Sequence, residues 1–115
     1  MDLPKQIYVA TCPVDMRLSF DRLAGLVRTE LGGDPRGEAL FVFHNKRRTH
    51  VKLLWHDGSG YLLLFKRLDR RRFRIPMAIP AGAASVEVPA RELRLILEGV
   101  DAAVLRAARR TARAA

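Results

Sequence analysis

The segment His56-Asp57-Gly58-Ser59-Gly60 places an imidazole, a carboxylate and a hydroxyl within five consecutive residues. These are the groups of a nucleophilic triad, in which a base accepts the serine proton and an acidic residue orients the base. A triad must hold its members rigidly toward one another, and a flexible turn between strands does not do so. Apolar runs flank the segment, and its two glycines suit a tight turn. We therefore predict a hairpin turn here, without catalytic residues.

The histidines and aspartates do not form a metal site by their spacing. His44, His50 and His56 are six residues apart, and the ends of a strand over 50–56 are about 20 Å apart. The aspartates are scattered along the chain and are explained by caps and turns. Residues 43–46 superficially resemble a His-Asn element of small nucleases but lack its second histidine in a following helix. We expect no metal and no cofactor, and a metal-dependent nuclease remains only the third alternative for function.

The apolar pattern predicts a single α+β domain over residues 1–100. The chain has 115 residues, of which 49% are hydrophobic, enough for one modest core. Short apolar or β-branched runs indicate strands at 6–11, 39–43, 50–56, 61–68 and 85–88. The middle three follow one another through short links, which is typical of an antiparallel meander. We expect a small antiparallel sheet of three to five strands.

Two helices are expected beside this sheet. Apolar residues at steps of three and four predict an amphipathic helix over 16–31 that begins at Asp15 as its N-cap and covers the sheet. Gly32 and Gly33 then end it. A second helix is expected to begin at Pro89 and to end at Gly99. The last segment, 101–115, is expected to be a basic tail rich in alanine and arginine, with helix propensity.

The positive charge is concentrated rather than spread. The formal net charge is +9, and residues 44–74 alone contain ten basic and two acidic residues, a net charge of +8. The partner that such a surface favours is a polyanion: DNA, RNA or, less often, an anionic membrane surface. No run of the sequence is long enough to span a membrane, and the single cysteine excludes an internal disulfide. We expect a cytoplasmic protein associated with the nucleoid.

Antiparallel topology brings the basic residues of this segment together. In a meander, the connection at 44–49 and the residues that follow the third strand lie at the same end of the sheet. The candidate DNA-binding residues, called the basic rim below, are Lys46, Arg47, Arg48, Lys66, Arg67, Arg70, Arg71, Arg72 and Arg74. Such residues bind phosphates with salt-sensitive affinity that is largely independent of sequence. Among the aromatic residues between them, Phe73 and Tyr61 are the best candidates for stacking on bases.

Four blocks of the sequence occur in the order typical of a known family. They read VDMRLSFDRLAGLV, LFVF, VKLLWHDGSGYLLLFKRLDRRRFRIP and ELRLILEGVD. Together they resemble the TnpB accessory proteins of the IS66 family of bacterial insertion sequences, from about Ile7 to Asp101. The matching positions are Asp15, Met16, Arg17, Phe20, Asp21, Leu23, Leu40 to Phe43, Lys52, Leu54, Trp55, Asp57, Gly58, Gly60, Lys66, Arg67, Leu68 and Phe73. His56 and Val88 depart from the pattern, where an aromatic residue and a capping Ser or Thr are usual.

The resemblance implies an auxiliary protein of transposition, encoded beside a large transposase that carries the strand-transfer chemistry. It implies no catalytic residues, and it makes Trp55, Asp57, Gly58 and Gly60 a family-signature turn. The expected partners are DNA at the transposon ends or the target, the transposase, and other proteins of the element. Our leading hypothesis is a DNA-binding accessory factor that is not an enzyme. The alternative is a protein–protein adaptor that docks on the transposase.

Overall fold

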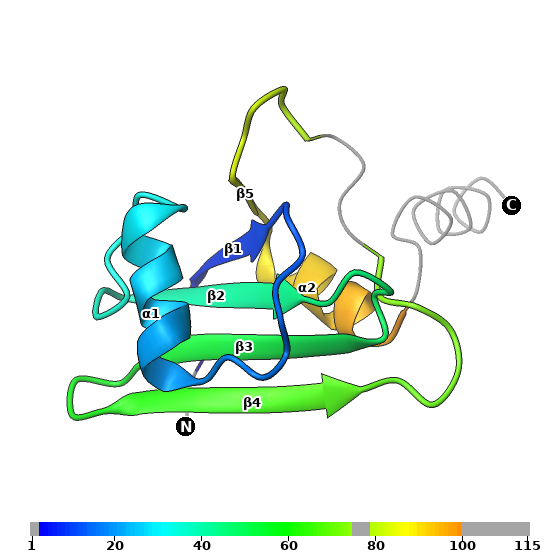
Figure 1. Ribbon diagram of the computed structural model, residues 1–115, viewed down its shortest axis with the longest axis horizontal. Coiled ribbons are helices and arrows are strands. Elements are labelled where there is room, and N and C mark those ends of the chain that lie inside the picture. The colour runs from blue at the N-terminus through cyan, green and yellow to red at the C-terminus, as the bar shows by residue number, and fades with distance from the viewer. Residues whose placement is uncertain (1–2, 75–78, 100–115) are drawn as a thin grey trace, which may run out of the picture.

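The computed structural model describes residues 3–74 and 79–99. Its strands are β1 (Gln6–Ala10), β2 (Ala39–His44), β3 (His50–His56), β4 (Tyr61–Arg67) and β5 (Ser85–Glu87), and its helices are α1 (Phe20–Thr29) and α2 (Ala90–Leu97). The strands form one sheet in the order β4-β3-β2-β1-β5, as Figure 1 shows. The α+β class is confirmed, while the expected tail at 101–115 lies outside the described residues.

The antiparallel meander is present in β2, β3 and β4. Phe41 pairs with Leu54 between β2 and β3, and Val51 pairs with Lys66 between β3 and β4. The short connections leave antiparallel pairing as the only arrangement for these strands, because a parallel pair needs a crossover of a dozen or more residues. The ends of β2 and β4 therefore lie at the same end of the sheet, as predicted.

The prediction of an all-antiparallel sheet is wrong for β1. This strand pairs in parallel with β2, with Ile7 opposite Leu40, and in antiparallel with β5, with Val9 opposite Val86. The long connection between β1 and β2 contains α1, so it can carry the chain back to the starting end of the sheet. The result is a mixed sheet in which β1 and β2 lie inside and β4 and β5 lie at the edges.

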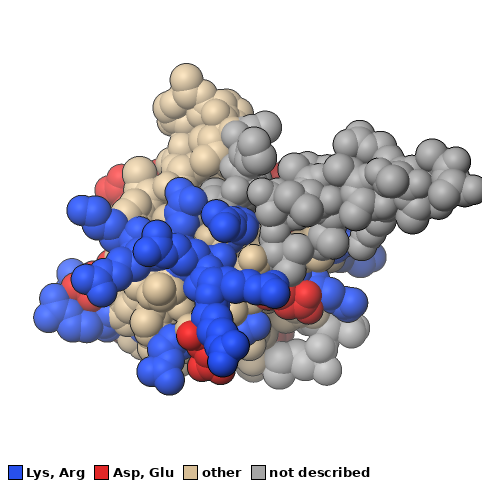
Figure 2. All heavy atoms as spheres, turned by 90° about the vertical axis from the view of Figure 1, so that its right-hand side faces the viewer, with Lys and Arg blue, Asp and Glu red and all other residues tan. Residues whose placement is uncertain are grey.

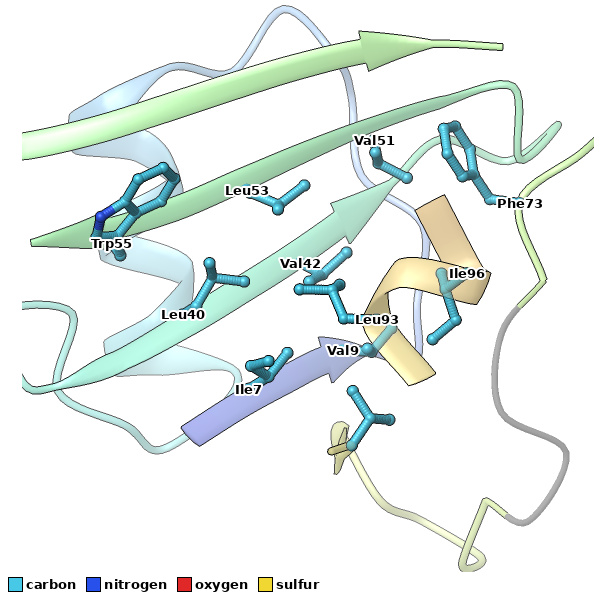
Figure 3. Packing of buried hydrophobic residues seen from close by; sticks show 11 residues of the cluster. Ile7, Val9, Leu40, Val42, Val51, Leu53, Trp55, Phe73, Leu93 and Ile96 are labelled. Atoms are coloured by element: carbon cyan, nitrogen blue, oxygen red, sulfur yellow. The ribbon is translucent and has the colours of Figure 1, made fainter. Parts of the chain in front are cut away.

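Both faces of the sheet are covered, where the sequence pattern predicted one cover. On one face Leu23 and Val27 of α1 pack against a cluster that includes Phe41 and Phe43. On the other face Leu93 and Ile96 of α2 join a cluster with Val9, Val42, Val51, Leu53 and Phe73, as Figure 3 shows. All six residues of β2 are buried. This two-sided burial explains why the middle strands are apolar on both faces.

Helix α1 begins later than predicted. Asp15 is not its N-cap: the Asp15 carboxylate accepts hydrogen bonds from the backbone and guanidinium of Arg17, and this pairing lowers the pKa of Asp15 to about 2. The backbone of Leu18 donates to the Asp15 carbonyl, which closes a turn before the helix. The helix begins after Ser19 and ends before Gly32, whose φ is 66°.

Helix α2 begins one residue later than predicted, at Ala90, and ends before Gly99 as predicted. Pro89 is the N-cap, no side chain caps the helix start, and Gly99 follows the helix with φ of 73°. In the described part of the chain, neither helix has the length and apolar content needed to cross a bilayer.

Candidate nucleic-acid interface

The segment between β3 and β4 is a hairpin turn. The Asp57 N–H donates to the carbonyl of Gly60, and Gly58 has φ of 100°. The Asp57 carboxylate accepts from the backbone and hydroxyl of Ser59 and from the backbone of Gly60, and these hydrogen bonds lower the pKa of Asp57. The Ser59 proton therefore points to a carboxylate oxygen, while His56 Nδ1 is occupied by the Gly58 N–H at 3.1 Å. These hydrogen bonds stabilise the turn. They do not place a base where it could activate Ser59 as a nucleophile.

The three histidines serve separate local structures. His44 is buried, and its ring nitrogens lie 3.0 Å from the Ala10 carbonyl and 3.1 Å from the Asn45 carbonyl. Burial lowers the pKa of His44. His50 Nδ1 contacts the Thr49 hydroxyl at 2.8 Å. Within residues 3–74 and 79–99, no three His, Cys, Asp or Glu side chains are grouped so that they could hold a metal ion.

The two basic segments lie side by side at the opposite end of the sheet from this turn. We call residues 45–49 the basic loop and residues 68–74 the basic arm. The Thr49 carbonyl accepts the Leu68 N–H at 3.0 Å, and the Arg48 carbonyl accepts the Phe73 N–H at 2.7 Å. His50 pairs with Arg67 where the two segments leave the sheet. The fold thus joins the two halves of the predicted basic rim through the backbone.

The basic loop is held in one shape by its own polar groups. The Asn45 side-chain oxygen accepts the backbone N–H groups of Thr49 and His50, and its amide donates to the Thr49 hydroxyl. Arg48 has a positive φ of 58°, a conformation that non-glycine residues adopt rarely. Its N–H and carbonyl are both hydrogen-bonded, to Asn45 and Phe73. These contacts offset the backbone strain at Arg48. They also hold the backbone of the basic loop in a fixed conformation, from which its basic side chains extend.

The buried ring of Phe73 anchors the basic arm to the core, and Leu68 at the start of the arm packs against the same cluster. Phe73 is 1% exposed and packs in the α2-side cluster beside Val51 and Ile96, as Figure 3 shows. The residues before it are exposed, and Arg71 has φ of 63°. The arm therefore turns sharply and returns to the core, which leaves its arginines on the outside.

Eight of the nine predicted rim residues are exposed, and Lys66 alone is half-buried. Figure 2 shows Lys and Arg gathered over this end of the molecule, with few acidic side chains among them. In the described part of the chain, none of the eight exposed side chains forms an ion pair or a hydrogen bond; the ion pair recorded there joins Arg17 and Asp15. The eight charges are therefore free to meet an external anion.

Lys66 has a structural role that sequence reasoning missed. Its ammonium donates to the Leu97 carbonyl at 2.9 Å, at the C-terminal end of α2. A cation is favourable there because the last carbonyls of a helix carry partial negative charge. Only the packing of α2 on the sheet brings the two groups together, so no local sequence signal could have found this contact.

Replacing Lys66 with methionine should lower the free energy of unfolding by about 1 kcal/mol, because the α2 carbonyl loses its charged donor. Urea unfolding followed by circular dichroism measures the change. Lys46→Met is the matched control, since Lys46 is exposed and has no partner in the described chain. Equal stability of the two variants would contradict the assignment of Lys66.

The structure corrects the choice of aromatic residues for base stacking. Phe73 is buried in the core, and the hydroxyl of Tyr61 is buried without a partner in the described chain. The exposed aromatic of the meander is Phe65 on β4, with 55% of its surface exposed. The sequence of β4 is apolar on both faces, which predicts that both faces are covered. Phe65 could therefore be recognised as an exposed residue only from the position of β4 at the edge of the sheet.

Comparison with known proteins decides the family. The family model described as IS66 Orf2 like protein matches residues 5–107. The chain belongs to the IS66 Orf2-like family. Two similar curated proteins are the uncharacterized proteins y4hO and y4jC of Sinorhizobium fredii, 40% and 34% identical over 96 residues. The matched parts cover 84% of this chain and 81% and 80% of the relatives. No solved structure matches the chain.

Membership in the IS66 Orf2-like family associates the chain with the transposition of insertion sequences in an accessory role. The family is one of accessory proteins and not a known catalytic family. Several residues shared with the family pattern have structural roles here. Lys66 contacts the end of α2, Phe73 anchors the basic arm, and Asp57 closes the hairpin turn.

Lys52, another position of the IS66 Orf2-like pattern, also has a structural role. Its ammonium donates to the Leu18 carbonyl at 2.6 Å, and the residue is 7% exposed. It therefore ties the turn before α1 to the sheet and is not available to a phosphate. Lys52, Lys66 and Phe73 thus belong to the frame of the molecule, whereas Arg67, also a position of the pattern, is exposed on the rim.

Proposed function

We propose that this protein is a DNA-binding accessory factor of transposition that is not an enzyme, and that the basic rim is its DNA-binding surface. The observation that carries the proposal is the meeting of the basic loop and the basic arm on one exposed surface. The backbone contacts of Thr49 with Leu68 and of Arg48 with Phe73 join them. A polyanion would neutralise the eight exposed basic residues and release counterions, which favours binding.

The proposed contacts are to phosphates rather than to base edges. Sequence readout in the major groove uses a helix or a two-stranded ribbon that enters the groove. The helix end closest to the rim is the C-terminus of α2, since Gly99 lies against Arg71 and Arg72. A helix C-terminus repels phosphate, and Lys66 offsets this negative end. We therefore propose binding that depends on charge and is only weakly dependent on sequence.

The proposed partners are DNA at the transposon ends or the target and the transposase of the element, in the bacterial cytoplasm at the nucleoid. The alternative is an adaptor whose arginines bind an acidic surface of the transposase. Both use the same rim, so the two functions must be separated by experiment. A nuclease is not supported by the hairpin turn, because the Asp57 carboxylate already accepts three hydrogen bonds within it.

Fluorescence anisotropy with labelled transposon-end and random duplexes of equal length tests the proposal. We expect binding to both, with a log–log salt slope between about −4.5 and −7, as for about five to eight phosphate contacts. No binding at low salt would contradict DNA binding. In that case a pull-down with purified transposase, after nuclease treatment and at high salt, that retains the protein would support the adaptor.

A further inference from the structure

One aromatic ring beside the basic rim is left open to solvent. Phe65 is 55% exposed, whereas Phe41, Phe43 and Phe73 are at most 3% exposed. It lies on β4, which is an edge strand, and it faces the α1 side of the sheet because it pairs with Lys52. A single exposed apolar side chain is common on protein surfaces, so the groups around this ring decide whether it forms a site.

The ring of Phe65 is held in position by two neighbours. The Lys52 ammonium lies 4.9 Å from the ring centroid, and the His50 ring lies 5.6 Å away at an interplanar angle of 38°. Both neighbours are themselves fixed, Lys52 by the Leu18 carbonyl and His50 by the Thr49 hydroxyl. Because the ring still exposes 55% of its surface, the side that these two groups do not contact is open. A ligand would therefore meet a preorganised flat surface.

The open ring continues into the basic rim. Arg67 follows two positions later on β4 and points to the same side of the sheet, about 7 Å along the strand. Arg67 is exposed and pairs with His50, which directly follows the basic loop. An aromatic surface and free cations thus lie next to each other on rigid backbone, which is the combination that binds single-stranded nucleic acid.

We propose that the protein binds single-stranded DNA, with an unpaired base stacked on Phe65 and the flanking phosphates on Arg67 and the basic loop. In a duplex both faces of a base are covered by its neighbours, so Phe65 would have no partner there. The cationic part of this site rests on the proposed DNA-binding function of the rim. The stacking part is separate, because the rim alone would not distinguish paired from unpaired DNA.

Affinities for an oligothymidine and for a duplex of equal length test the proposal. Phe65→Ala is expected to weaken binding of the oligothymidine by about tenfold and to leave duplex binding unchanged. Phe65→Leu, which keeps an apolar side chain without an aromatic face, should lose affinity to a similar degree. Leu64→Ala is the matched control, since Leu64 is 43% exposed on the opposite face of the same strand.

Unchanged oligothymidine affinity in Phe65→Ala would overturn the stacking proposal, while the duplex data would still test the rim independently. A second readout comes from Phe65→Trp, whose fluorescence should be quenched by the oligothymidine, because Trp55 is 6% exposed and contributes a constant background. An exposed edge strand can also pair with another copy of the chain. If Phe65→Ala and Leu64→Ala both lose self-association while oligothymidine binding is unchanged, the ring contacts a second copy of the chain. That result would overturn the proposal.

Discussion

Replacing Arg70, Arg71 and Arg72 together with alanine is expected to weaken duplex DNA binding by about a hundredfold at 0.15 M salt. The three arginines are exposed on the basic arm and form no ion pair with the described chain. Each lost phosphate contact reduces the salt slope by about 0.9, so three contacts reduce it by about 2.7. Fluorescence anisotropy over a salt series measures the affinity and the slope in one experiment.

The fold should tolerate this change. Arg71 has φ of 63° and its Cβ lies near Gly99, and alanine keeps both the backbone preference and the Cβ. The matched control replaces Arg22, Arg28 and Arg36, which are exposed but lie on α1 and in the connection after it. This control removes the same net charge from outside the rim. If both triple variants lose the same affinity, DNA binding depends on the total charge of the protein and not on the basic rim.

Replacing Phe73 with alanine is expected to lower the free energy of unfolding by about 3–5 kcal/mol. The ring is 1% exposed and is packed against the end of α2 and against β3. Its removal leaves a cavity and also releases the basic arm from the core. Because small domains are stable by only about 5–15 kcal/mol, the variant should be near the limit of folding. Urea unfolding followed by circular dichroism gives the difference.

Two variants make this result interpretable. Phe73→Leu keeps most of the volume and should lose no more than about 1.5 kcal/mol. Phe20→Ala removes an aromatic ring that is 41% exposed and should have a much smaller effect than Phe73→Ala. In Phe73→Leu, where the protein stays folded, duplex affinity should remain close to that of the natural chain. A small effect of Phe73→Ala on stability would show that the basic arm does not depend on this anchor.

The sequence predicted the meander and the meeting of its basic segments because both depend on local properties. Residues 39–43, 50–56 and 61–68 are apolar runs with short links, and short links permit only antiparallel pairing. Antiparallel pairing then places the basic loop and the basic arm together, as the contact of Arg48 with Phe73 shows. The hairpin turn was equally predictable, since the residues of a tight turn carry its hydrogen bonds themselves.

The place of β1 and the second cover of the sheet could not be predicted in this way. The run at 6–11 has strand propensity, but nothing in it states whether its neighbour is parallel or antiparallel. That choice depends on α1 packing across the face and on α2 filling the other face, both of which bring together residues far apart in the chain. The start of α1 was missed for a related reason, because Asp15 pairs with Arg17 instead of capping the helix.

The sequence by itself thus determined the elements, the meander and the concentration of charge, because each follows from neighbouring residues. Only the tertiary structure decided which of the charged side chains are bound within the protein and which are exposed. Lys66 and Lys52 are bound to the carbonyls of Leu97 and Leu18, so they differ from the exposed arginines although their charge is the same. Likewise Phe73 is buried while Phe65 is exposed. Burial depends on which elements pack over a residue, and that is settled only when distant parts of the chain meet.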